Sequence, residues 1–442
     1  RCGIVRSRGP STVWSTGAAI VLVVIGAAGA IWSALAGRDF MYDLEQSRSA
    51  LGRTTPTVID PRTPRLSRRV VIAIVDGLSE SKSHGLPYLD RLRRLGVDGQ
   101  AQSHYPSWSR PNYVSILTGV PPQASGVRTN YHYTPVVLDS LMDRVHAAGL
   151  RVAAADDGVA MPRLFLRPAS DAELDLIDID ALDDPETSES IEALRAHDFD
   201  LVSPFDDARH TPWPGGFAPA GRALIDAGHD LVILLFDAVD AAGHGHGADS
   251  EEYDEACGIA DRALVRALSG LDLTEDTVIV VADHGHTRRG GHGGMEPEVM
   301  EVPLIMAGAG VLPGTSPADA YLIDVAPTVA ALLGIPAPGH GLGRTLTELL
   351  TLDPGAAAAR IQADRSRLAV SQAIVDEAVS RFDTETLERR GMRLAWIGLL
   401  AALAIGLAIA LHRFGGMRLD WRALLLGVPA FFVVYYTLIG TV

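Results

Sequence analysis

Four short apolar runs, rich in β-branched residues, restrict the fold of this chain more than any other feature. They are VVIAIV at 70–75, LRVAAA at 150–155, LVILLF at 231–236 and TVIVVA at 277–282. Strands of a parallel sheet are covered by helices on both faces, so their side chains are apolar without alternation. Helical patterns occur between the runs, as at 136–148 and 251–269. The sequence therefore predicts an α/β fold with a mainly parallel central sheet flanked by helices.

Acidic residues follow three of these four runs. Asp76 ends the first, Asp237 and Asp240 follow the third, and Asp283 follows the fourth. A single Asp after a strand commonly serves as a turn or helix-cap residue. Open parallel sheets, however, bind ligands beyond the carboxyl ends of their strands. Acids at three strand ends therefore predict a functional site on one edge of the sheet.

Histidines accompany two of these acids. Asp240 and His244 form a D-x-x-x-H pattern, Asp283 is followed directly by His284, and His292 lies in the glycine-rich string GGHGG. Imidazole and carboxylate donors without a thiolate are typical of zinc or manganese at an open catalytic site. Two further histidines, His246 and His286, are interpreted as exposed or supporting groups.

A candidate nucleophile lies in the string SWSRPNYV. Ser109 precedes Arg110, Pro111 and Asn112, and a helical pattern follows. Proline is well tolerated near a helix start, and a serine there would lie at the positive end of the helix dipole. As an isolated string, S-x-P-N is equally typical of a serine that merely caps a helix.

Together these motifs resemble, in order, the motif set of the alkaline phosphatase superfamily, and most closely the type I phosphodiesterase/nucleotide pyrophosphatase family. The resemblance covers about 68–350, and the segment 322–346 is similar to the closing segment of that superfamily. The motifs that carry it are IVDG with Asp76, SRPN with Ser109, DAAGH at 240–244, ADHG at 282–285 and GGHGG at 290–294.

The resemblance implies an alkaline-phosphatase-like fold and a centre with two zinc ions, for which manganese is an alternative. One ion would be held by Asp76, Ser109, Asp283 and His284, and the other by Asp240, His244 and His292. Asp237 is the alternative to Asp240. Asn112 would donate a hydrogen bond to a phosphate oxygen, and Ser109 would form a phospho-serine intermediate.

Two enzyme functions follow from this resemblance. The first is a membrane-anchored phosphodiesterase or phosphatase that acts on small or lipid-linked phosphate esters. The alternative is a phosphoethanolamine-type transferase, in which an acceptor hydroxyl replaces water. The short gap between Asp283 and His292 is similar to that in the ethanolamine phosphate transferases of glycolipid anchors. A sulfatase is disfavoured because Tyr113 stands where its C/S-x-P-x-R motif needs arginine, and an inactive interaction module because all seven ligand positions are filled.

Composition excludes several other classes. The net charge of −16 argues against a nucleic-acid partner, which needs a basic surface. The only lysine, Lys82, lies outside any GxxxxGK string, which excludes a P-loop. The two cysteines, Cys2 and Cys257, cannot form a disulfide framework or a cysteine-rich zinc module. No obligate protein partner is evident.

Three uncharged apolar runs are long enough to cross a bilayer. They extend over 24 residues at 13–36, 18 residues at 394–411 and 20 residues at 423–442. The first is also compatible with a cleaved signal peptide that ends at Ala34-Leu35-Ala36. Arginines before the first run and in the loop 412–422 predict a multi-pass protein of the cell membrane with an extracytoplasmic catalytic domain. The basic residues Arg389, Arg390 and Arg393 argue against that orientation.

These features predict five segments along the chain. Residues 1–38 form a transmembrane anchor or signal peptide, and the proline-containing residues 39–67 form a linker. Residues 68–350 form the catalytic domain. Residues 351–392 form an amphipathic stalk helix with Ile361, Leu368, Val375 and Phe382 at seven-residue spacing, and 393–442 form two transmembrane helices. The missing initial Met and the apolar end are expected for part of a longer membrane protein.

Overall fold

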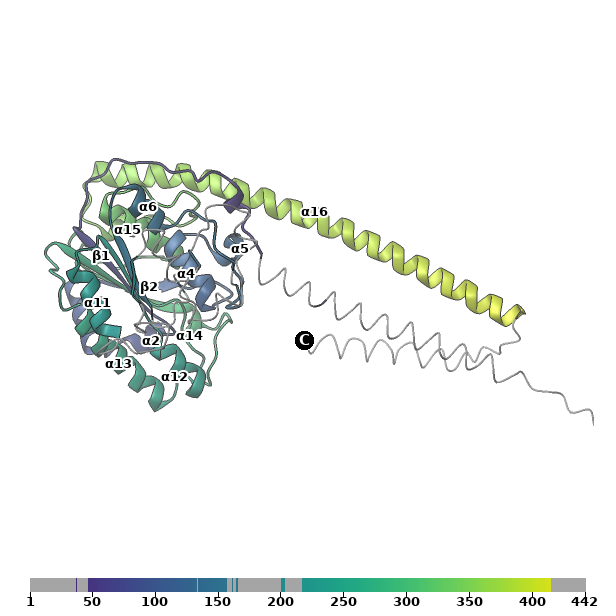
Figure 1. Cartoon of the computed structure of the whole chain (residues 1–442), viewed down its shortest axis with the longest axis horizontal. Coiled ribbons are helices and arrows are strands. Elements are labelled where there is room, and N and C mark those ends of the chain that lie inside the picture. The colour runs from purple at the N-terminus through teal and green to yellow at the C-terminus, as the bar shows by residue number, and fades with distance from the viewer. Residues whose placement is uncertain are drawn as a thin grey trace, which may run out of the picture. The chain divides into compact units, whose positions relative to one another are not determined.

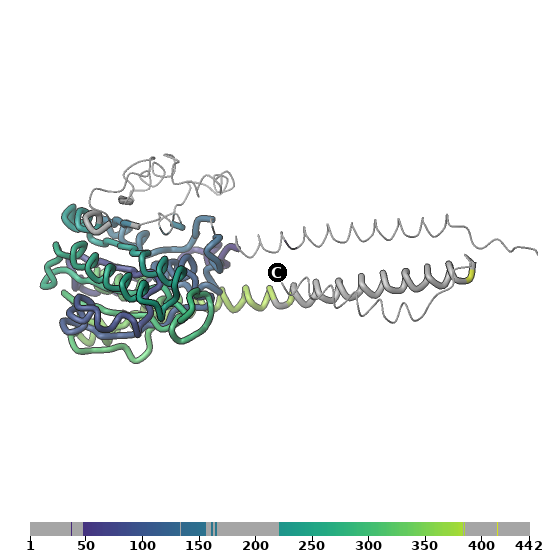
Figure 2. Tube along the Cα trace, turned by 90° about the horizontal axis from the view of Figure 1, so that it is seen from below, coloured from purple at the N-terminus to yellow at the C-terminus, as the bar shows by residue number. Residues whose placement is uncertain are grey.

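The computed structural model describes residues 37, 47–132, 134–156, 161, 164–165, 200–202 and 217–414. For 156, 200–202, 217–220, 383, 385–412 and 414 it describes the backbone alone. The chain divides into two compact units, Arg38–Ala378 and a second formed by Arg1–Gly37 with Val379–Val442. Figure 2 traces the chain in colour along the residues whose side chains are described. The site discussed below lies within the first unit.

A sheet of seven strands, in the order β2-β7-β6-β1-β5-β3-β4, forms the centre of the first unit. The predicted parallel arrangement is confirmed for the pairs β1·β5, β1·β6, β3·β5 and β3·β4. Only β7 runs against its neighbours. The strands are β1 (Arg69–Val75), β2 (Val97–Gln102), β3 (Val152–Asp156), β4 (Asp200–Val202), β5 (Leu231–Phe236), β6 (Asp276–Val281) and β7 (Glu301–Gly308).

The three central strands are covered on both faces, as their apolar composition predicts. Every residue of β1, β5 and β6 is buried. Ile72 of β1 lies in register with Ile233 on one side and Ile279 on the other. Because these strands are parallel neighbours, the residues that follow Val75, Phe236 and Val281 emerge at the same edge of the sheet.

Helices pack on both faces of the sheet (Figure 1). One layer contains α3, α11 and α13, and the other contains α4, α6 and α15. The helices are α2 (Glu80–Ser83), α3 (Pro87–Leu95), α4 (Ser109–Thr118), α5 (Pro122–Ser125), α6 (Leu141–Ala147), α11 (Phe217–Asp226), α12 (Ala238–His246), α13 (Glu251–Ala267), α14 (Pro297–Met300), α15 (Val325–Leu333) and α16 (Pro354–Phe414). Short 3-10 turns lie at η1 (Leu51–Arg53), η2 (Leu322–Asp324) and η3 (Thr347–Leu349).

Helix α16 contains the predicted stalk, but it buries a different face from the one expected. Val375 packs on the core, whereas Ile361 and Phe382 of the same heptad series are exposed. The fully buried face is polar and consists of Arg360, Asp364, Arg367 and Ser371, which are spaced three or four residues apart. Apolar spacing therefore gave the correct element and the wrong contact face.

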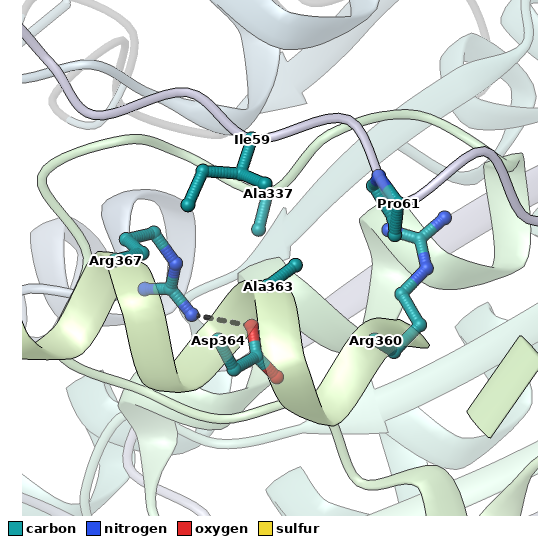
Figure 3. A pocket seen from close by; sticks show the side chains of 7 residues that line it. All are labelled: Ile59, Pro61, Ala337, Arg360, Ala363, Asp364 and Arg367. Atoms are coloured by element: carbon teal, nitrogen blue, oxygen red, sulfur yellow. Dashed lines mark hydrogen bonds and ion pairs between the residues drawn. The ribbon is translucent and has the colours of Figure 1, made fainter. Parts of the chain in front are cut away.

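Figure 3 shows how this polar face is stabilised, around a small pocket lined by Ile59, Pro61 and Ala337 from outside the helix. Arg367 donates to the backbone carbonyls of Gly341 and Gly343 and pairs with Asp364 at 2.7 Å. Asp364 in turn accepts from the backbone N–H of Thr345 at 2.7 Å. The charges are tolerated inside because each one meets a specific backbone or ionic partner.

Residues around the predicted membrane spans are only partly described. The runs 13–36 and 423–442 lie outside the described residues, as does most of 157–216. Residues 394–411 continue α16 as helix, with their backbone alone described. Within the described part of the chain, no helix is long and apolar enough to cross a membrane.

Candidate metal centre

Two carboxylates and one imidazole converge where β1 and β6 end. Asp76 follows β1, and Asp283 and His284 follow β6; all three side chains are buried. The Nε2 atom of His284 lies 3.4 Å from Oδ1 of Asp76 and 3.3 Å from Oδ2 of Asp283. The parallel pairing of the two strands is what brings these residues together from distant parts of the sequence.

Ser109 joins this group as the first residue of α4. Its Oγ atom lies 3.1 Å from Nε2 of His284. The backbone of the preceding residue, Trp108, is extended, and its side chain does not cap the helix. The helix therefore begins at Ser109 itself. The candidate nucleophile Ser109 and the predicted first-ion ligands Asp76, Asp283 and His284 therefore surround one centre.

A second group lies beside the first and is built from α12 and the glycine-rich loop. Oδ1 of Asp240 lies 3.6 Å from Nε2 of His292, and its Oδ2 lies 3.5 Å from Nε2 of His244. The Nε2 atoms of His244 and His292 are 3.0 Å apart. The imidazoles of His284 and His292 stack with centroids 3.8 Å apart, so the two groups are contiguous.

Two of the histidines are oriented by backbone carbonyls. Nδ1 of His284 donates to the carbonyl of Gly285 at 3.1 Å, and Nδ1 of His292 donates to that of Ser107 at 2.9 Å. This assignment puts the proton on Nδ1 and leaves the Nε2 lone pair directed at the centre. Ligating histidines have the same arrangement, in which the outer nitrogen is fixed by an acceptor.

Burial shifts the pKa values of two carboxylates and two imidazoles of the site in the direction that favours their neutral forms. It raises the pKa of Asp283 to about 7, and the nearby charge of Asp240 acts in the same direction. Burial followed by the charge of Asp283 raises the pKa of Asp76 well above its ordinary value. Burial also lowers the pKa of His284 and of His292 to about 4, which makes both imidazoles neutral at pH 7.

Asp240 behaves differently from the other two carboxylates. Burial works to raise its pKa, but the hydrogen bond from His286 and the surrounding histidines keep that pKa below its ordinary value. Asp240 is therefore ionised at neutral pH. A half-buried carboxylate that faces several imidazoles is a strong site for a cation.

The donor set fits divalent cations. Among the described residues, Oδ1 of Asp76 and Oδ2 of Asp283 are buried without a hydrogen-bond partner, which is costly unless another group compensates. Two clusters have ligand atoms within 4.8 Å of one another: Asp76, Asp283 and His284, and Asp240, His284, His286 and His292. Carboxylate and imidazole donors without thiolates suit zinc or manganese. The cations would satisfy the orphaned oxygens and offset the repulsion between carboxylates.

Two glycines allow the loops to approach this closely. Gly77 has φ +78, and a Cβ there would lie 2.7 Å from the Cα of Asp240. Gly293 has φ +100, and a Cβ there would lie 1.9 Å from Nε1 of Trp108. The hydroxyl of Ser107 joins the loop before α4 to the glycine-rich loop. It accepts from the N–H of Gly293 at 3.0 Å and donates to the carbonyl of Gly294 at 2.8 Å.

Asn112 and Asp237, which were also predicted for the site, have surroundings unlike those of the candidate ligands. The amide of Asn112 lies one turn after Ser109 and is fully buried. It donates to the backbone carbonyls of His104 and Trp108 and accepts from the N–H of His104, each at 3.2 Å. In this structure Asn112 thus holds the loop before α4, and its contact with phosphate stays a prediction. Asp237, the alternative to Asp240, is exposed at the start of α12.

Sequence reasoning missed Tyr113 and left His286 open between an exposed and a supporting group. Tyr113, noted only for its place in the sulfatase motif, donates its hydroxyl to Oδ2 of Asp76. His286, grouped with His246, is fully buried and bonds Asp240, whereas the side chain of His246 is half exposed. The alternation in Asp283-His284-Gly285-His286 is a signal for His286, because β-type alternation directs residues 284 and 286 to the same side.

Comparison with known proteins places these residues in a family context. The profile of the type I phosphodiesterase/nucleotide pyrophosphatase family matches residues 70–292 of the 442, which contain every predicted ligand. Human GPI ethanolamine phosphate transferase 3, catalytic subunit, is 25% identical over 314 residues, which cover 64% of this chain and 26% of that protein. The 2,3-bisphosphoglycerate-independent phosphoglycerate mutase of Dinoroseobacter shibae is 33% identical over 133 residues, or 28% of this chain and 25% of that protein.

A solved structure similar to this chain is murine ectonucleotide pyrophosphatase/phosphodiesterase 5. It has a TM-score of 0.47 at 13% identity, and the match covers 64% of this chain and all of that one. The chain spans about a quarter of the length of the curated relatives it matches.

Proposed function

Because the chain belongs to the type I phosphodiesterase/nucleotide pyrophosphatase family, we propose that it is a phosphodiesterase with a two-cation centre and a phospho-serine intermediate on Ser109. The observation that carries the proposal is the placement of the Ser109 hydroxyl 3.1 Å from His284, in a buried group with Asp76 and Asp283. A serine that only capped a helix would not need two buried carboxylates beside its hydroxyl.

Each residue has a role in this proposal. Asp76, Ser109, Asp283 and His284 hold one cation, and Asp240, His244 and His292 hold the other; zinc fits the donor set best, with manganese as the alternative. When bound, the cations supply positive charge that favours the serine alkoxide and offsets the charge of the phosphate.

The chain's own residues then carry out two displacements. In the first, Ser109 Oγ forms a bond to phosphorus as the bond to the leaving ester oxygen breaks. In the second, water attacks the same phosphorus and the bond to Ser109 Oγ breaks, which regenerates the hydroxyl. His284 stays neutral throughout the physiological range, because burial lowers its pKa to about 4. Its Nε2 atom therefore keeps the lone pair with which it would hold the cation beside Ser109.

The proposal extends to where the enzyme works. The apolar runs 13–36, 394–411 and 423–442 would anchor it as a multi-pass protein of the cell membrane, with 68–350 outside the cytoplasm. Its substrates would then be small phosphate esters of that compartment or lipid-linked phosphate esters in the membrane itself.

A second candidate function has support from the relatives. Several of them are GPI ethanolamine phosphate transferases, matched over nearly two thirds of this chain. In such a transferase the first displacement on Ser109 would be unchanged, and an acceptor hydroxyl would replace water in the second.

The proposal is tested with the purified full chain and four aryl esters: a phosphate diester, a phosphate monoester, a phosphonate monoester and a sulfate ester. We expect the diester to be hydrolysed fastest and the sulfate slowest. A zinc chelator should abolish the activity, and added zinc or manganese should restore it. Hydrolysis that survives complete removal of metal would contradict the proposal.

The two candidate functions separate when an alcohol acceptor is added to the same assay. A hydrolase partitions the phospho-serine mainly to water, so the rate of aryl release changes little. A transferase releases the aryl group slowly in water, and the acceptor increases that rate and appears in the product.

A further inference from the structure

His286 has a hydrogen-bonding pattern unlike that of the histidines proposed as ligands. Its side chain is completely buried, and its Nε2 lies 2.7 Å from Oδ1 of Asp240. Its Nδ1 is buried and, among the described residues, has no hydrogen-bond partner. His284 and His292 show the reverse arrangement, since their Nδ1 atoms donate to backbone carbonyls and their Nε2 atoms face the centre.

This difference assigns the proton of His286. A carboxylate that serves as a cation ligand can only accept a hydrogen bond, so the His286 nitrogen that bonds Asp240 is the donor. A neutral imidazole with the proton on Nε2 leaves a lone pair on Nδ1. The alternative tautomer would bury an N–H without an acceptor and place two lone pairs 2.7 Å apart. A nitrogen that carries a proton cannot bind a cation at the same time.

Packing shows that space is reserved for this imidazole. A Cβ added to Gly243 of α12 would lie 2.4 Å from Cδ2 of His286. The ring therefore lies against the helix backbone, between Asp240 and His244. Its centroid is 5.1 Å from that of His244 and 5.1 Å from that of His292, both nearly perpendicular. The glycine of the DAAGH string is thus required by the size of the neighbour.

We propose that His286 is a positioning residue that fixes the Asp240 carboxylate as a ligand of the second cation, through an Nε2–H···Oδ1 hydrogen bond. With Oδ1 held in this way, Oδ2 faces His244 at 3.5 Å, and the carboxylate is presented to the centre in one orientation. The inference rests on the proposed two-cation centre. His286 would affect the binding of the second cation through Asp240, and it does not contribute to the proposed ligand set of the first.

The test compares His286→Leu with His286→Gln in the full chain. Leucine removes the donor, whereas the amide nitrogen of glutamine can reach the position of Nε2. After chelation and titration with zinc, His286→Leu should weaken binding of one of the two cations by roughly 10- to 100-fold, as loss of a partner of a ligand usually does. His286→Gln should stay within a few-fold of wild type. The matched control is His246→Leu, at a half-exposed histidine that ends α12, the helix that carries Asp240.

A second measurement reads the protonated nitrogens in the wild type itself and uses a variant only to assign one signal. Long-range ¹H–¹⁵N correlation spectra of the zinc-loaded wild type report which nitrogen of each histidine carries the proton. We expect the Nε2–H form for His286, assigned by its loss in His286→Gln, and the Nδ1–H form for His284 and His292. An Nδ1–H form of His286 with a zinc-shifted Nε2 would make it a ligand and overturn the inference.

The outcomes separate this inference from the proposed function. If the chelated wild type takes up no zinc or manganese, the proposed function fails. If it takes up two ions and His286→Leu binds both as tightly as wild type does, only the role of His286 fails. Equal loss in His286→Leu and His286→Gln would likewise contradict positioning through a donated hydrogen bond.

Discussion

At the scale of single residues, the chemistry depends most directly on the Ser109 hydroxyl. We expect Ser109→Ala to reduce turnover of an aryl phosphate diester by roughly 10³-fold or more, because it removes the oxygen on which the proposal places the phosphoryl group. Zinc content should stay close to that of wild type, since Asp76, Asp283 and His284 remain. Activity is measured by aryl release and metal content by elemental analysis of the same samples.

The matched control is Ser109→Thr, which keeps a hydroxyl on the same carbon. It should retain part of the activity and give a phosphorylated protein when the reaction is quenched with acid. Near wild-type turnover in Ser109→Ala would remove Ser109 from its proposed role. A loss of zinc in parallel with activity would instead make it chiefly a metal ligand.

Single residues also show where sequence reasoning stops. The acids and histidines at 76, 240, 244, 283, 284 and 292 could be predicted because each follows a strand or lies in a glycine-rich string. The function of Tyr113 could not, since its hydrogen bond to Asp76 depends on a three-dimensional neighbour that no spacing encodes. For His286 the alternation with His284 indicates a supporting group, but only the fold shows that its partner is Asp240. The same holds for Asn112, whose amide bonds its own preceding loop.

At the scale of elements, the N-terminal part of α16 makes the sharpest prediction. Arg367 is buried and bonds two backbone carbonyls and Asp364. Arg367→Met should lower the free energy of unfolding by about 3–5 kcal/mol, because it leaves Asp364 as an unpaired buried charge. Chemical denaturation of the full chain, followed by tryptophan fluorescence, measures the change.

Arg365→Met provides the control on the same helix. Arg365 is exposed, so its replacement should change the free energy of unfolding by less than about 0.5 kcal/mol. Equal, small effects of the two substitutions would mean that the polar face of α16 is not anchored as described.

Elements with a strong pattern were predicted well, and weakly patterned ones were not. The run 231–236 coincides with β5, and 70–75 and 277–282 each match a strand to within one residue. Strands β2 and β7 were not predicted. In β2, VDGQAQ contains few apolar residues, and in β7 Pro303 argues against a paired strand although it lies opposite Gln100. The buried face of α16 was missed because its charges are satisfied by backbone groups.

At the scale of the whole molecule, the site is a consequence of topology. Strand β1 lies between β5 and β6 in the sheet and is parallel to both. In the sequence, β1, β5 and β6 begin near residues 70, 230 and 280. The sheet therefore gathers three acids that are distant along the chain onto one edge, where the helices and loops that follow supply the histidines. This concentration of carboxylates makes the metal-free protein sensitive to pH.

Asp283 determines the direction of that sensitivity. In the folded, metal-free protein its pKa is raised from 3.8 to about 7, first by burial and then by the charge of Asp240. Between these two values the folded state holds more protons on Asp283 than the unfolded chain does. The contribution of Asp283 to the free energy of unfolding is fully present below about pH 3.8 and is lost as the pH rises through about 7. The depressed pKa values of His284 and His292 act in the opposite direction, so a comparison with a variant is needed.

We therefore expect Asp283→Asn to be more stable than wild type when both are chelated. The difference in Tm should widen as the pH rises from 4 to 7 and become constant above about 8. Asp237→Asn, at an exposed carboxylate at the start of α12, is the matched control. With saturating zinc the order should reverse, because a cation that binds the folded state alone stabilises wild type more than a protein lacking one ligand. Parallel Tm curves for chelated wild type and Asp283→Asn would show that Asp283 is not held in a raised-pKa environment.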